Sequence, residues 1–136
     1  VIIKDIVHEL AHLLEDKAYY DIYGDNTVEN EYIGKKKKLV EILRANGVSF
    51  HGMGSLFFSD DQVDELDDFL YTQLGYENLS SITPGLFLNA YSVTSIREYF
   101  ANGFEEYILG DIHYLKEISP KLYETIENIM EKYDRF

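Results

Sequence analysis

Two histidines four residues apart, with a glutamate directly after the first, give residues 8–12 the pattern H-E-x-x-H. On an α-helix, residues four apart lie about 40° from one another around the axis, so His8 and His12 point the same way. Two imidazole nitrogens on one helix face can bind a single Zn²⁺ at about 2.0–2.1 Å. Glu9 lies about 100° from His8 around the helix, where its carboxylate can act as general base on a water molecule. The pattern therefore indicates a zinc site with an adjacent base.

A second interpretation of the same residues needs no metal. A five-residue pattern with two free positions also arises by chance, and an apolar helix can carry histidines that merely form hydrogen bonds. A catalytic zinc site has three protein ligands and one open position, so a third ligand elsewhere in the chain would favour the metal site.

The elements that must position these residues are predicted from apolar spacing and helix boundaries. Apolar residues recur at helical spacing over residues 1–14, and neither Gly nor Pro interrupts residues 1–20, which predicts a first helix at the start of the chain. A second helix is expected over 28–46 with Gly47 after its end, and its four lysines, residues 35–38, are expected to form a solvated face. Further along, we expect a loop or short strand over 47–58, a helix over 59–74, irregular chain over 76–94, a helix over 95–109 and a last helix from Ser119-Pro120 to about 134. The chain is therefore predicted to be mainly helical.

Composition narrows the class of protein. The 136 residues are 46% apolar, which is enough chain and enough apolar side chain for one domain with a core. The net charge of −13 argues against binding to nucleic acid or to anionic membrane surfaces. There is no cysteine, so disulfides and thiolate zinc sites are excluded. No apolar run is long enough to span a bilayer. No signal peptide precedes the first charged helix, and this abrupt start leads us to expect a fragment of a longer protein.

The search for a third zinc ligand leads to Glu98. His51 and His113 each stand alone, without a supporting pattern around them. Glu98 falls in the first turn of the helix expected after Ser95, from which a carboxylate can reach a neighbouring helix and complete a His₂Glu site. The alternative is that Ser95 and Glu98 form a capping box, which would engage the same carboxylate. Local pattern leaves both alternatives open.

Two motifs in a fixed order resemble a known family. The sequence H-E-L-A-H at residues 8–12 is followed by Tyr91, six residues, E-Y-F-A at 98–101, and then Phe104. Together they resemble the catalytic domain of the anthrax lethal factor family, which also contains the clostridial Pro-Pro endopeptidases. The stretch KLYETIENIMEKY, after Pro120, is similar to the closing helix of that family, whereas residues 30–85 match it poorly.

The resemblance implies a role for five residues and a fold. It implies that His8, His12 and Glu98 bind Zn²⁺, that Glu9 is the general base, and that Tyr91 donates a hydrogen bond to the developing oxyanion. It implies a mainly α fold within an α+β zincin-like class. Residues 1–136 would be the helical C-terminal part of a single gluzincin-type catalytic domain, with the upstream sheet largely absent from this chain. Zn²⁺ is the only cofactor expected.

The function that the resemblance implies is a zinc-dependent endopeptidase that hydrolyses peptide bonds with metal-activated water. Its partners would be a peptide or protein substrate and upstream domains of the parent chain, and its location would be secreted, as a toxin or protease. The first alternative is a non-catalytic binding or docking module of the same fold within a larger toxin. The second is a helical interaction domain without metal.

The chain departs from the family at one position. In the anthrax lethal factor a second glutamate follows the ligand glutamate by four residues, and this chain has Asn102 at that position. Asn102 shares a helix face with Glu98, so we expect it to hydrogen-bond a ligand histidine without supplying charge.

Overall fold

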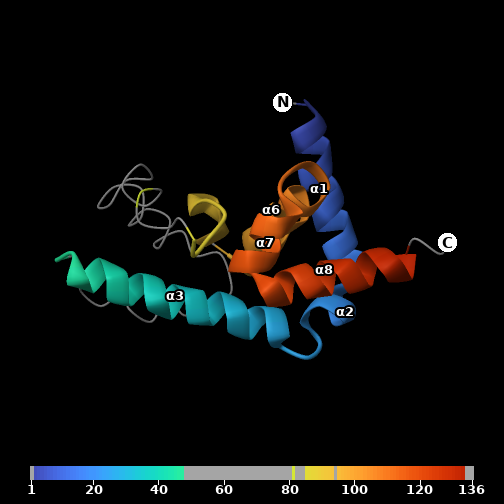
Figure 1. The fold of residues 1–136 in the computed structure, drawn as a ribbon. Helices are drawn as coiled ribbons and strands as arrows, with labels where there is room; N and C mark the ends of the chain where they lie inside the picture. Colours follow the sequence, from blue (N-terminus) through green and yellow to red (C-terminus); the bar gives the residue numbers. More distant parts are fainter. Residues whose placement is uncertain (1, 48–80, 82–84, 94, 134–136) are drawn as a thin grey trace.

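The computed structural model of the chain describes residues 2–47, 81, 85–93 and 95–133, except for the side chains of residues 90 and 91 (Figure 1). Within these ranges the secondary structure is helical, with no β-strand, so the prediction of a mainly helical chain is confirmed. The expectations for residues 48–58 and 59–74, and with them His51, lie outside the described residues.

The first predicted helix forms two helices in the structure, α1 (Ile2–Lys17) and α2 (Tyr19–Tyr23). The break falls at Ala18, whose backbone has φ −108° and ψ 27°, outside the α-helical region. Ala18 is buried at the junction, and the change of direction places Ile22 in the core. The helix predicted at the start of the chain is therefore present, but it is interrupted at Ala18, although neither Gly nor Pro stands there.

Helix α1 has two different apolar faces. One packs into the core through Val7 and Ala11, which are buried. The other is exposed and carries five large aliphatic side chains (Ile2, Ile3, Ile6, Leu10 and Leu13). Among the described helices, none is both long enough and apolar enough to cross a membrane.

Helix α3 (Thr27–Ala45) confirms the helix expected over 28–46. Its end is followed by Gly47 with φ 84°, a left-handed conformation that glycine adopts without the steric cost other residues meet. The helix lies along the base of the molecule in Figure 1 and packs against α8 and α6.

The lysine run on α3 is not the solvated face that we expected. Lys37 and Lys38 are exposed, but Lys35 and Lys36 are buried. The Lys35 ammonium donates to the Leu86 carbonyl at 2.6 Å and to Ser119 Oγ at 2.5 Å, and burial lowers its pKa to about 8. Consecutive helix residues point about 100° apart, so a run of four necessarily spans buried and exposed faces.

Helix α6 (Ile96–Leu109) carries Glu98, and a short 3₁₀ helix, η3 (Ala90–Val93), precedes it. Ser95 caps α6, because its side chain accepts a hydrogen bond from the Glu98 N–H at 3.2 Å. Phe100 and Phe104 carry the buried face of α6 into the core, where their rings stack. The start and end predicted for this helix are confirmed.

Two further helices close the core. Helix α7 (Ile112–Ile118) had not been predicted, and Asp111 caps it by accepting hydrogen bonds from the backbone N–H groups of His113 and Tyr114. Helix α8 (Pro120–Tyr133) begins and ends close to where the sequence predicted. The Glu31 carboxylate of α3 accepts hydrogen bonds from the N–H groups of residues 121 and 122, which ties α3 to the start of α8.

Candidate metal centre

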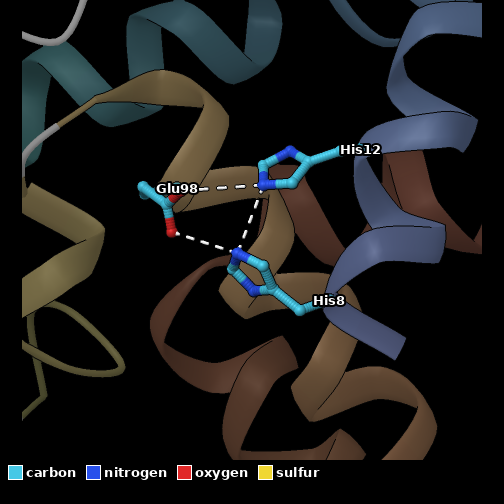
Figure 2. Close-up of side chains that lie close together, drawn as sticks. All are labelled: His8, His12 and Glu98. Carbon is cyan, nitrogen blue, oxygen red and sulfur yellow. Dashed lines mark hydrogen bonds and ion pairs between the residues drawn. The ribbon is translucent and has the colours of Figure 1, made fainter. Parts of the chain in front are cut away.

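Three side chains that the sequence singled out converge on one point (Figure 2). The Nε2 atoms of His8 and His12 are 3.2 Å apart. The Glu98 carboxylate lies 3.5 Å from His8 Nε2 through Oε2 and 3.7 Å from His12 Nε2 through Oε1. Ligand atoms bonded to a tetrahedral Zn²⁺ at about 2.0–2.1 Å lie about 3.3–3.4 Å from one another. The spacing of these donor atoms, and their chemical type, therefore fit Zn²⁺.

The packing of α1 against α6 produces this convergence. His8 contacts Glu105, His12 contacts Glu98, and Glu15 contacts Arg97. Residues later in α1 therefore meet residues earlier in α6. The two helices are therefore antiparallel. This register places Glu98 opposite the pair of histidines (Figure 2).

The two imidazole rings are arranged to point their Nε2 atoms at the carboxylate. Their centroids are 4.7 Å apart and their planes stand at 87°, a nearly perpendicular pair. The His8, His12 and Glu98 side chains are 29%, 21% and 26% exposed, so the centre is neither sealed in the core nor fully solvated. A half-open position of this kind leaves room for a further ligand beside three protein donors.

The choice between ligand and cap for Glu98 has a structural answer in two parts. Ser95 uses its hydroxyl to cap the helix, so the first half of the capping box is present. The Glu98 carboxylate extends instead toward His8 and His12. Cap formation and metal binding are therefore compatible, because the cap needs only the Glu98 backbone N–H.

A residue that sequence reasoning missed lies behind His8. Glu105 is buried on α6, and its carboxylate hydrogen-bonds His8 Nδ1. When Nδ1–H donates to a carboxylate, the lone pair remains on Nε2, which faces the other candidate ligands. The signal was present in the sequence, because Glu105 follows Glu98 by seven residues, two helical turns on the same face.

The expectation for Asn102 was wrong. The side-chain oxygen of Asn102, Oδ1, accepts a hydrogen bond from Asn89 Nδ2 at 2.7 Å, and its Nδ2 donates to the Glu98 backbone carbonyl at 2.8 Å. These bonds engage both polar ends of the short amide side chain. Asn102 therefore ties the segment before η3 to α6, and the carboxylate partner of His8 comes from Glu105, one turn further along.

A second carboxylate stands near the other histidine. Glu15 is 2% exposed and its Oε1 lies 4.0 Å from His12 Nδ1. Arg97 Nε donates to Glu15 Oε1 at 2.7 Å, and the Tyr23 hydroxyl donates to Oε2. The hydrogen bond to Glu15 raises the pKa of Arg97, and burial raises the pKa of Tyr23, so both donors keep their protons.

The remaining predicted site residues lie around this centre. Glu9 is on the exposed side of α1, about 60° around the helix from His12. The backbone of Tyr91 is in η3, and its side chain lies outside the described part of the structure. His113 is exposed on α7 and is not part of the cluster.

The antiparallel α1–α6 pair thus presents a candidate His₂Glu metal centre. A carboxylate lies near the Nδ1 atom of each histidine, on the side of the ring away from the other candidate ligands.

Comparison of the chain with protein-family models, with curated proteins and with solved structures found no match.

Proposed function

We propose that this chain carries the metal centre of a zinc-dependent endopeptidase. The observation that carries the proposal is the convergence of His8, His12 and Glu98, two of them from α1 and one from α6, at separations suited to one tetrahedral ion. His12 and Glu98 are 86 residues apart in sequence and lie on two different helices. Hydrogen bonding within one helix therefore does not explain why their side chains meet.

The donor set supports zinc rather than calcium or magnesium. Two imidazole nitrogens and one carboxylate form the set found in catalytic zinc sites, whereas Ca²⁺ and Mg²⁺ take oxygen ligands. The contact of Glu105 with His8 supports the same conclusion, because a metal-binding histidine usually donates its other N–H to a carboxylate or carbonyl. When bound, Zn²⁺ would polarise a substrate carbonyl and make an attacking water more acidic.

The protein's own residues supply the other parts of peptide hydrolysis. Glu9, exposed beside the histidines, is proposed to take a proton from the attacking water and to deliver it to the leaving amine. Tyr91 is proposed to donate a hydrogen bond to the oxygen of the tetrahedral carbon, as the resemblance to the lethal factor family implies. The substrate would be a peptide or protein segment.

The finer fold class and setting of the chain are part of the same proposal. A zincin-like α+β domain needs a sheet that packs on the motif helix, and the exposed face of α1 carries five large aliphatic side chains suited to such contact. We propose that residues 1–136 belong to one catalytic domain of a longer, secreted protease or toxin, and that another part of that protein covers this face.

Metal analysis tests the first half of the proposal. The purified chain is expected to bind one Zn²⁺, and His12→Ala is expected to abolish binding because two donors would remain. Stoichiometric zinc in His12→Ala would refute the assignment of the ligands.

Peptide cleavage by the parent protein tests the second half. A library of proteome-derived peptides is incubated with the protein, and new termini are identified by mass spectrometry. Glu9→Gln should keep zinc at full occupancy and lose about 10²–10⁴-fold in rate, because an amide cannot accept the proton. Tyr91→Phe should also keep zinc and lose less activity. Cleavage by Glu9→Gln at the parental rate would leave the metal centre standing and remove the peptidase mechanism.

A further inference from the structure

His12 has a buried nitrogen without a hydrogen-bond partner. Its Nδ1 atom is shielded from solvent, and the Glu15 carboxylate oxygen Oε1 lies 4.0 Å away. A buried polar group without a partner costs free energy, and a metal-binding histidine needs its outer N–H held by an acceptor. His8 has such an acceptor in Glu105, so the two histidines differ in this respect.

Glu15 is held in place from two sides. Arg97, from α6, donates to Oε1, and Tyr23, from α2, donates to Oε2. A carboxylate has about four acceptor positions, so Glu15 can accept a third hydrogen bond. Because Glu15 is 2% exposed, solvent does not compete for that position.

We propose that Glu15, held by Arg97 and Tyr23, is a positioning residue that accepts a hydrogen bond from His12 Nδ1 and orients His12 for zinc. The inference rests on the zinc centre proposed above. Accepting this hydrogen bond keeps the proton on Nδ1 and leaves the Nε2 lone pair directed toward Glu98.

The position of Arg97 gives this network a second consequence. Arg97 directly precedes Glu98 on α6, so its bond to Glu15 joins α1 and α6 beside the ligands that each helix supplies. Replacement of Arg97 also changes zinc affinity in a direction that distinguishes a positioning role from a charge effect. Removal of a positive charge near a dication would tighten zinc binding by relieving Coulomb repulsion, whereas loss of a positioning contact would weaken zinc binding.

The main experiment compares two neighbouring acidic residues. Zinc dissociation constants are measured by competition with a chromophoric chelator for wild type, Glu15→Gln and Asp16→Asn. Both substitutions remove one negative charge near Arg97, but Asp16 is 72% exposed and lies 4.0 Å from Arg97 Nη2. Glu15→Gln is expected to weaken zinc binding about 10-fold or more, and Asp16→Asn less than about twofold.

Two further variants test the support of Glu15 without altering it. Tyr23→Phe should weaken zinc binding about 2–5-fold, because one hydrogen bond to the carboxylate is lost. Arg97→Met should weaken binding as well, against the Coulomb expectation. Thermal unfolding of the metal-free variants records any general loss of stability. Nitrogen-15 NMR of zinc-loaded wild type should show His12 protonated at Nδ1 with a downfield proton, which Glu15→Gln moves upfield.

The outcomes separate this inference from the proposed function. Zinc bound by wild type with the predicted order of affinities, and a hydrogen-bonded His12 Nδ1, supports both. Zinc bound equally tightly by wild type, Glu15→Gln and Tyr23→Phe, or more tightly by Arg97→Met, overturns the positioning role and leaves the zinc centre intact. Should Glu15→Gln not fold, Tyr23→Phe and the wild-type NMR spectrum decide in the same way. A wild-type chain that binds no zinc overturns both proposals.

Discussion

Replacement of Glu105 by glutamine isolates the contribution of the carboxylate behind His8. The structure buries Glu105 and bonds its carboxylate to His8 Nδ1. Glutamine is nearly the same size and still offers an oxygen to Nδ1–H, so the substitution exchanges a charge-assisted hydrogen bond for a neutral one. Hydrogen bonds to charged groups contribute about 1.5–3 kcal/mol, against about 0.5–1.5 kcal/mol for neutral ones. The expected loss is about 1–1.5 kcal/mol, which corresponds to zinc binding about 10-fold weaker.

Glu105→Ala extends the same measurement. It removes the acceptor altogether and leaves a donor in a partly buried position, so zinc affinity should fall about 30–100-fold. Chelator competition at fixed pH and ionic strength measures both losses. The neighbouring Glu106→Gln is the matched control, because it removes the same charge while its amide oxygen can still accept from the Asp111 N–H, 2.9 Å away in wild type. Equal zinc affinities for Glu105→Gln and Glu106→Gln would refute the reasoning, because the effect would then be one of net charge.

Three further predictions concern stability and the third ligand. Lys35→Met should reduce the dependence of the unfolding free energy on pH. Burial lowers the Lys35 pKa to about 8 in the folded chain, so between pH 8 and 10.5 the unfolded chain holds a proton that the folded chain has lost. The unfolding free energy of wild type therefore rises with pH by up to about 1.4 kcal/mol per pH unit in this range. Urea titrations at several pH values measure both slopes, and equal slopes would contradict this. Gly103→Ala should lower the free energy of unfolding by about 1–3 kcal/mol, since the new Cβ would lie 2.4 Å from a methyl group of buried Leu122. Urea unfolding measures this change, and a free energy of unfolding equal to that of wild type would contradict the packing of Gly103 against Leu122. Glu98→Gln should lose zinc affinity in calorimetric titration while circular dichroism shows the helix capped by Ser95 intact, and unchanged zinc affinity would leave Glu98 a cap residue only.

Much of the helical framework was readable from the sequence because its signals are local. Ser95 and Pro120 mark helix starts, and Gly47 and Gly110 mark helix ends, through hydrogen bonds and backbone angles within a few residues. Helix α7 was missed because it is only seven residues long, too short for a periodic pattern to stand out.

The burial of charged side chains was not readable in this way. A lysine side chain enters a core only where other segments supply acceptors, and Lys35 finds them in Leu86 and Ser119, 51 and 84 residues away in sequence. The same holds for Glu15, whose donors come from α2 and α6. Neither partner set follows from the residues that flank the lysine or the glutamate.

The sequence by itself determined that His8 and His12 share one face of a helix, because their spacing matches the helical repeat. It also offered Glu98 as a third donor, with a competing role as cap. Only the tertiary structure decided where that carboxylate points, since the antiparallel register of α1 and α6 sets which residues meet across the helix pair. The same register placed Glu105 behind one histidine and Glu15 beside the other. Contacts between helices depend on the packing of whole faces, and no short stretch of sequence contains that information.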